Sequence, residues 1–254
     1  MHYQGEHMKA RGVVSILAVV AFAAGTLVGC SINGSGPWIN RAELTGETTT
    51  EARSVSGFTG IAVSGTATLS VTQGESFSVA VTTDSGLQKH IDTSVRGSTL
   101  EIEQNYSVAG RAPDVSVTVT MPRLTYLDVS GSSSTTITKV RGDSLHVSSS
   151  GSSDIRIDAE VKTLAVAVDG SGDLALAGSA GSADIAVSGS GTVNGSDLAA
   201  ARANVSVSGS GDVMLRVDTT LDASVSGSGN ITYYGEPAVN SRVAGSGSVH
   251  RSGS

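Results

Sequence analysis

The feature that most constrains this chain is a short repeat built around glycine. A Gly/Ser turn recurs through the second half of the sequence, and successive turns are 18 to 20 residues apart. A repeat of this length cannot bury an apolar face alone, so its copies are expected to stack. The first glycines of the turns are Gly131, Gly151, Gly170, Gly189, Gly209, Gly227 and Gly245.

Apolar residues keep fixed positions relative to each repeat glycine. Two positions before it stand Val129, Val168, Val187, Val207, Val225 and Val243. Four positions after it stand Ile155, Leu174, Val193, Val213, Ile231 and Val249. Ser149 and Thr135 interrupt these two columns, one in each. Apolar and polar residues alternate around the turns, which is typical of strands with one buried face.

We therefore predict an all-β fold, a single parallel β-solenoid (β-helix) with about 18–20 residues per coil. Parallel neighbours need a return connection, and the remainder of each coil supplies it. The crossover rule favours right-handed winding. A sandwich of antiparallel hairpins is the alternative, because Gly/Ser turns suit it as well. The recurring columns favour the solenoid.

The segment before the regular repeat is strand-like but irregular. Residues 61–65, Ile-Ala-Val-Ser-Gly, resemble a repeat turn. We expect this part to form atypical first coils, with residues 57–73 as the end cap and a short helical turn at 87–91. The solenoid domain is thus predicted to span residues 53–254.

The N-terminus has the pattern of a bacterial lipoprotein signal. Lys9 and Arg11 precede an apolar run, residues 13–28, that is short for a transmembrane helix. The run ends Leu-Val-Gly-Cys at Cys30, which resembles a lipobox. We expect residues 1–29 to be the signal peptide and residues 30–52 to be a flexible tether. The lipid on the Cys30 thiol would make the membrane a partner of the chain. A plain secretory signal or a membrane anchor, with an incidental cysteine, is the alternative, and Met1 or Met8 can be the start.

The composition excludes several kinds of partner and site. The net charge is −7, and the exported part has no basic run, which argues against nucleic-acid binding. Cys30 is the one cysteine, so an intramolecular disulfide or a thiolate metal site is excluded. Aromatic residues make up only 4% of the chain, so the core must be aliphatic.

The exported part resembles the head GIN domain family, labelled putative autotransporter adhesin. Matching stretches are Gly57-Phe58-Thr59-Gly60-Ile61-Ala62-Val63, Gly97-Ser98-Thr99-Leu100-Glu101-Ile102, residues 124–131 and the repeated Val-Ser-Gly-Ser-Gly turns. The resemblance covers roughly residues 55–254 and implies a parallel β-helix. It implies no catalytic residues.

One polar column is a candidate metal site. The residue three after each glycine would line up on an outer edge, and Asp154, Asp173 and Asp212 are weak calcium candidates there. Asp and Asn are also ordinary turn residues, and the nine-residue calcium β-roll motif is missing, so a structural ladder is the favoured interpretation. We therefore predict no metal ion and no other cofactor.

No catalytic site is predicted. The histidines of the mature chain, His90, His146 and His250, lie far apart in sequence and show no metal-binding spacing. Tyr106, Tyr126, Tyr233 and Tyr234 are the few candidate aromatic platforms for a glycan. If Tyr233 and Tyr234 lie in one strand, one of their rings points outward, because neighbours in a strand point to opposite faces. One packed ring and one ring exposed by chance is the favoured interpretation.

We expect a lipid-anchored module outside the cytoplasm, on the outer membrane if the host is Gram-negative. Its predicted role is non-enzymatic: binding, adhesion or envelope structure, with an envelope glycan or protein as candidate partner. The alternative is an enzyme acting on extracellular polysaccharide, which a cluster of Asp, Lys or Arg in one groove would favour. The sequence leaves the oligomeric state open.

Overall fold

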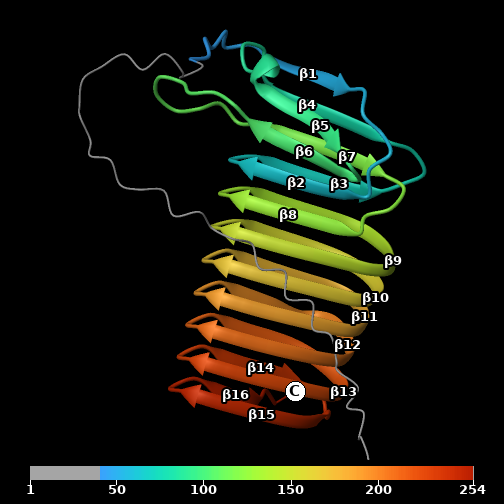
Figure 1. Cartoon of the computed structure of the whole chain (residues 1–254), viewed down its shortest axis with the longest axis vertical. Coiled ribbons are helices and arrows are strands. Elements are labelled where there is room, and N and C mark those ends of the chain that lie inside the picture. Colours follow the sequence, from blue (N-terminus) through green and yellow to red (C-terminus); the bar gives the residue numbers. More distant parts are fainter. Residues whose placement is uncertain (1–40, 254) are drawn as a thin grey trace, which may run out of the picture. The chain divides into compact units, whose positions relative to one another are not determined.

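The computed structural model describes residues 41–253; the expected signal peptide, Cys30 and the start of the tether lie outside this range. The described chain is almost entirely β-structure (Figure 1). Its N-terminal part holds one short 3-10 helix, η1 (Gln88–His90), and the strands β1 (Thr48–Arg53), β2 (Gly60–Gly65), β3 (Thr68–Gln73), β4 (Ser78–Asp84), β5 (Ile91–Arg96), β6 (Thr99–Gln104), β7 (Ser116–Met121) and β8 (Tyr126–Gly131). Its C-terminal part holds β9 (Ser134–Gly151), β10 (Asp154–Gly170), β11 (Asp173–Gly189), β12 (Thr192–Gly209), β13 (Asp212–Gly227), β14 (Asn230–Tyr234), β15 (Ala238–Gly245) and β16 (Ser248–Arg251).

Each regular coil is one long strand that bends near its middle. Both halves of β10 pair with β9 on one side and β11 on the other, and the halves form the two faces of a flattened stack (Figure 1). Every pairing from β8 to β16 is parallel. The predicted β-solenoid is confirmed, with about seven turns of roughly 19 residues. The alternative of antiparallel hairpins is wrong.

The predicted apolar columns are in register. Val187 pairs with Val168 in the coil before it and with Val207 in the coil after it, and each of these side chains is about 1% exposed. Burying a valine in this way contributes roughly 1.5–3 kcal/mol. Because the core is only two sheets thick, its stability comes from many such aliphatic contacts along the stack.

The tight turns need glycine for two different reasons. Gly151 has φ 108°, and a Cβ there would also collide with the carbonyl oxygen of Gly131 in the preceding coil. Gly211 is the second glycine of a later turn, and its φ is not in the left-handed region. Packing alone prevents a side chain at this position. A Cβ there would lie 2.6 Å from Cγ1 of Val187. The valine of one coil therefore fills the space that the second glycine of a later turn leaves open.

The interruptions of the apolar columns produce a small polar region in β9 and in the turns that precede β9 and β10. The hydroxyls of Ser149 and Ser153 lie 2.7 Å apart and are buried. Those of Ser133 and Thr135 are also buried, and neither has a hydrogen-bond partner within residues 41–253. An unpaired buried hydroxyl costs about 1–3 kcal/mol, so these two coils are expected to be less stable than their neighbours.

The end cap differs from the one predicted. Residues 57–73 were expected to form it, but β2 and β3 make a regular coil that pairs in parallel with β8 and β9. The strands β6 and β7 stack on the other side of that coil, and β5, β4 and β1 close the end by antiparallel pairing. The later segment caps the stack because the chain returns over its own first coil. The helical turn expected at 87–91 is confirmed as η1.

Part of the expected tether belongs to the folded domain. Thr48 to Arg53 form β1, and Ala42 is 6% exposed. The Asp84 carboxylate holds the approach to β1, because it accepts hydrogen bonds from the backbone N–H groups of Thr45 and Gly46 at 3.1 and 2.8 Å. These bonds hold the pKa of Asp84 below its usual value. The domain therefore starts before residue 53.

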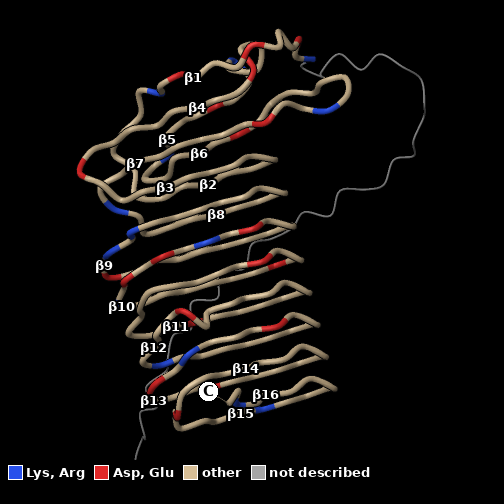
Figure 2. The backbone as a smooth tube through the Cα atoms, turned by 180° about the vertical axis from the view of Figure 1, so that it is seen from behind, with Lys and Arg blue, Asp and Glu red and all other residues tan. Residues whose placement is uncertain are grey.

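The surface of the stack is sparsely charged, and Figure 2 shows long uncharged stretches along the coils. At the C-terminal end, Val239 and Val243 are 39% and 46% exposed, because no described coil covers β15. None of the helical structure within residues 41–253 has the length and apolar character needed to cross a membrane.

Candidate functional site

One turn of the stack is greatly expanded. Between β2 and β3, a two-residue turn separates Gly65 from Thr68. In the coil above, β6 ends at Gln104 and β7 begins at Ser116, so residues 105–115 replace the short turn. Insertions in repeat proteins collect on one edge and often form the binding face. This loop is therefore the strongest departure from the repeat in the described chain.

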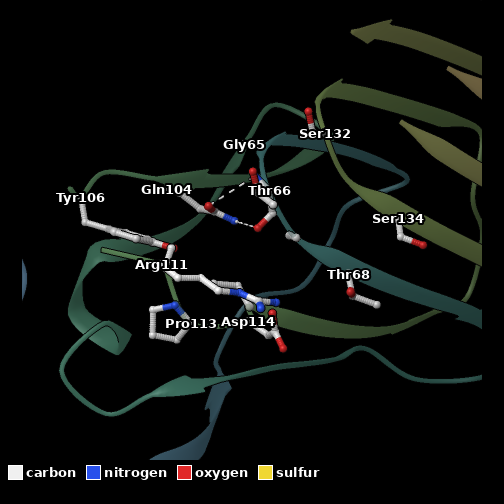
Figure 3. Close-up of a pocket in the computed structure, with 13 residues that line it drawn as sticks. Gly65, Thr66, Thr68, Gln104, Tyr106, Arg111, Pro113, Asp114, Ser132 and Ser134 are labelled. Carbon is white, nitrogen blue, oxygen red and sulfur yellow. Dashed lines mark hydrogen bonds between the residues drawn. The ribbon is translucent and has the colours of Figure 1, made fainter. Parts of the chain in front are cut away.

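The loop roofs a hollow of about 550 Å³, which we call the loop pocket. It is lined by loop residues and by the turns of the two coils that follow: Gly65, Thr66, Ala67, Thr68, Gln104, Tyr106, Arg111, Ala112, Pro113, Asp114, Val115, Ser132 and Ser134. Figure 3 shows the Tyr106 ring at one end of the pocket and Ser134 at the other, with Arg111 and Asp114 between them.

Gln104 holds the floor of the loop pocket in place. Its side-chain amide donates to the carbonyl oxygen of Thr66 at 2.9 Å, and its oxygen accepts from the Thr66 N–H at 3.4 Å (Figure 3). Gln104 stands beside Gly65, where the other coils have a repeat glycine. In later coils the backbone of one repeat glycine packs on that of the next, and here the Gln104 side chain packs on Gly65 instead.

Tyr106 packs against the core, whereas the pocket residues Arg111 and Asp114 extend into solvent. Tyr106 is half-buried against the core, and burial raises the pKa of its hydroxyl. Arg111 and Asp114 are exposed. None of the ion pairs within residues 41–253 involves Arg111 or Asp114. A fixed aromatic ring beside unpaired polar groups is an arrangement able to bind a ligand.

The start of the described chain fixes the loop. Arg41 pairs with Ser107 in a parallel bridge, and the N–H of Ala42 donates to the Ser107 carbonyl at 3.0 Å. The loop pocket therefore lies close to the point where the chain enters the folded domain.

The residues of the predicted polar column are in register on the outside of the stack. Asp154 pairs with Asp173, and Thr192 separates Asp173 from Asp212. The Asp212 carboxylate accepts from the side-chain amide of Asn230 at 2.9 Å. In the described part of the chain, no group of three or more His, Asp or Glu side chains is placed to hold a metal ion. The interpretation as a structural ladder stays a prediction.

The histidines are not brought together. His146 stacks on Tyr126 with ring centroids 5.7 Å apart, and His250 lies within 3.1 Å of the Thr232 hydroxyl. His90 lines a separate hollow of about 350 Å³ in the cap, beside Arg53 and Asp92. Tyr233 is partly buried against the core, and Tyr234 faces Arg216 at 5.8 Å.

Sequence reasoning missed the loop pocket. The available signal was the long interval between Gly65 and Gly131, in which the repeat glycine fails and residues 110–114 read Gly-Arg-Ala-Pro-Asp. That signal shows an irregular segment, but not which coil the segment overhangs.

The comparisons with known proteins agree with the fold. The model of the family described as "Putative auto-transporter adhesin, head GIN domain" matches residues 57–237. A crystal structure of a "putative adhesin" from Bacteroides fragilis is similar with a TM-score of 0.76 and 23% identity, and covers 81% of this chain and 97% of its own.

Two proteins of Parabacteroides distasonis are also similar. One, described as a "Putative lipid binding protein", has a TM-score of 0.71 and 24% identity, and the other, a "putative adhesin", has 0.66 and 25%. Each match covers 84% of this chain and 100% of the other. No curated protein matches the sequence significantly. None of these descriptions names an enzyme. The extent of the family match shows that the chain belongs to the head GIN domain family of putative auto-transporter adhesins.

Proposed function

We propose that the protein is a non-enzymatic binding module of the cell envelope, held outside the cytoplasm by lipid on Cys30. The signal-like run that ends at Cys30 supports the anchor. The adhesin description of its family supports the binding role. The regular solenoid supplies a rigid support, and the loop pocket supplies the site.

The single observation that carries the binding role is the expanded turn. The 11 residues 105–115 are costly to order, since each fixed backbone residue loses about 1–2 kcal/mol of conformational entropy. Here the loop is held by Arg41 and by Gln104 over a hollow that contains an aromatic ring and two charged groups. Such an ordered exception to a regular repeat is expected at a functional position.

The anchor would also set where the module works. The chain from Cys30 to Arg41 is about 11 residues long, which spans at most roughly 40 Å when extended. Arg41 pairs with the loop. A tether of this length would keep the module near the protein's own envelope, which favours an envelope component as the ligand.

The anchor is tested by metabolic labelling. Wild-type protein should take up labelled palmitate in its native host, and Cys30→Ser should not, while Ser31→Ala serves as the matched control that stays labelled. A wild type that takes up no fatty acid rejects the lipid anchor.

The binding role is tested separately with the purified full chain. It should be retained by delipidated envelope fractions of the host, and a chain in which residues 105–115 are replaced by Thr-Ala, the turn of the first coil, should be retained less. Equal retention of both proteins would show that the loop pocket is not the binding site.

An enzyme acting on polysaccharide is the second candidate. The cap hollow brings Arg53, Lys89, His90 and Asp92 together, which is the kind of cluster such an enzyme needs. However, the Arg53 guanidinium already donates hydrogen bonds of 3.0 and 2.8 Å to the Glu51 carboxylate and the Gln88 side-chain oxygen. Release of reducing ends from envelope polysaccharide, lost in His90→Ala, would favour the enzyme.

A further inference from the structure

We propose that the loop pocket binds a short neutral saccharide. This proposal rests on the binding role above and names the chemical class of its ligand. It follows from the charge, the hydrogen-bonding groups, the aromatic ring and the size of the pocket, taken in turn.

The charge of the loop pocket favours a neutral ligand. Arg111 and Asp114 contribute one charge of each sign, and the pocket has no other ionisable lining residue except the Tyr106 phenol. An anionic ligand would be attracted by the Arg111 guanidinium but repelled by the Asp114 carboxylate. A cationic ligand would be attracted by the carboxylate and repelled by the guanidinium. A ligand that both donates and accepts hydrogen bonds can use both groups.

The remaining polar groups suit a ligand with several hydroxyls. Thr68, Ser132 and Ser134 place exposed hydroxyls along the coil side of the pocket. A hydroxyl donates one hydrogen bond and accepts others, so it can pair with sugar hydroxyls in either sense. The loop side presents the five donors of Arg111 and the acceptor oxygens of Asp114 (Figure 3).

Tyr106 supplies the one aromatic platform among the residues that line the loop pocket. An aromatic ring is a large rigid contact surface with a polar end, and the C–H face of a sugar ring is the apolar part of an otherwise polar molecule. The volume of about 550 Å³ lies within the range of roughly 300–1,000 Å³ that is typical of small-molecule sites, and it accommodates one or two sugar rings. Ala67, Ala112, Pro113 and Val115 also line the pocket, so a lipid chain is the competing ligand that the test includes.

The test measures binding of the full chain, immobilised on a sensor surface, to maltose, mannobiose and N,N′-diacetylchitobiose. Digalacturonate is the anionic comparison and oleate the lipid comparison. We expect at least one neutral disaccharide to bind in the millimolar range or tighter. Tyr106→Ala and Arg111→Gln should each weaken that binding about tenfold or more.

The chain offers a matched control for the arginine. Arg202 is exposed on β12 and does not line the loop pocket, so Arg202→Gln should leave saccharide binding unchanged. Arg111 is exposed and removing its charge should not unfold the protein, which keeps the test valid if Tyr106→Ala lowers the melting temperature.

Three outcomes would overturn the proposal. The first is that no neutral disaccharide binds at a concentration ten times above a millimolar Kd. The others are that binding does not change in either pocket variant, or that digalacturonate or oleate binds more tightly than every neutral disaccharide. Each is distinguishable from failure of the binding role. If the envelope fraction still retains the wild type, the role stands and only the ligand class is wrong.

Discussion

At the scale of single residues, the second glycine of each turn and the valine of the preceding coil depend on each other. Gly191, Gly211, Gly229 and Gly247 share this arrangement, since a Cβ on each would lie 2.6–2.8 Å from Cγ1 of a valine. The sequence pattern Val-Ser-Gly-Ser-Gly therefore indicates a packing contact between neighbouring coils as well as a turn.

Gly211→Ala tests this contact. We expect it to lower the free energy of unfolding by about 1–3 kcal/mol, because the methyl group overpacks the site. Gly142→Ala is the matched control: a Cβ there meets nothing within 4 Å and its φ is not in the left-handed region, so its stability should stay within about 1 kcal/mol of wild type. Chemical denaturation measures both, and equal effects would contradict the packing argument.

Val207→Asp tests the core column. Val207 is 1% exposed between Val187 and Val225, so a carboxylate there is buried without a partner and should cost about 4 kcal/mol or more. Ser210→Asp, on the exposed turn of the same coil, should be close to neutral. Thermal melts followed by circular dichroism distinguish the two, and a mild effect of Val207→Asp would mean that the column is not dry.

At the scale of elements, Asp84 attaches β1 and the preceding segment to the cap. Its Oδ1 and Oδ2 accept backbone hydrogen bonds from Gly86, Thr45 and Gly46. Acceptor-only carboxylate oxygens suit such a group of N–H donors, and an amide in the same place would point its own N–H₂ at one of them. The attachment of β1 is therefore expected to depend on pH.

The sign follows from the direction of the pKa shift. Because the folded-state pKa of Asp84 is lowered, its stabilisation is complete above the unfolded pKa near 4 and is lost as the pH falls through the folded value. Asp84→Asn should melt at a lower temperature than wild type at pH 7, and the difference should close as the pH falls below about 4. Asp184→Asn, on the exposed outer face of β11, is the control; a difference that does not shrink at all as the pH falls below about 4 would contradict the assignment.

The polar ladder is the second element that can be tested. We expect millimolar calcium to leave the melting temperature of the wild type unchanged within about 2 °C, equivalent to less than roughly 1 kcal/mol. Asp173→Ala should behave the same. A strong rise with calcium that Asp173→Ala abolishes would show that Asp154, Asp173 and Asp212 bind metal after all.

At the scale of the whole domain, the stack behaves as a one-dimensional array in which each coil contacts its neighbours. Asp173 and Asp212 each pair with Thr192 between them, so removing the intervening coil would bring equivalent residues of β11 and β13 into direct register. The domain should therefore tolerate the loss of a whole coil better than the loss of part of one.

Deletion of residues 190–209 removes one coil and joins Gly189 to Ser210, which restores the Gly-Ser-Gly turn. We expect a folded domain shorter by about 4.8 Å, measured by small-angle scattering and circular dichroism. Deletion of residues 200–209 removes half a coil and shifts the apolar columns, and it should not fold. Equal folding of both would contradict the in-register stack.

The sequence alone determined the period and the buried columns and favoured parallel pairing, because each of these depends on contacts between equivalent positions of neighbouring repeats. The structure decided between the parallel coils and antiparallel hairpins. The interval between Gly65 and Gly131 carries no such repetition, so its strands could not be paired in advance. Only the tertiary structure placed β6 and β7 above the first coil, made β1 part of the cap and brought Tyr106 and Arg111 over the turn at Thr66. These contacts join unlike segments far apart in the chain, and their partners are chosen by packing of the whole cap instead of by any local pattern.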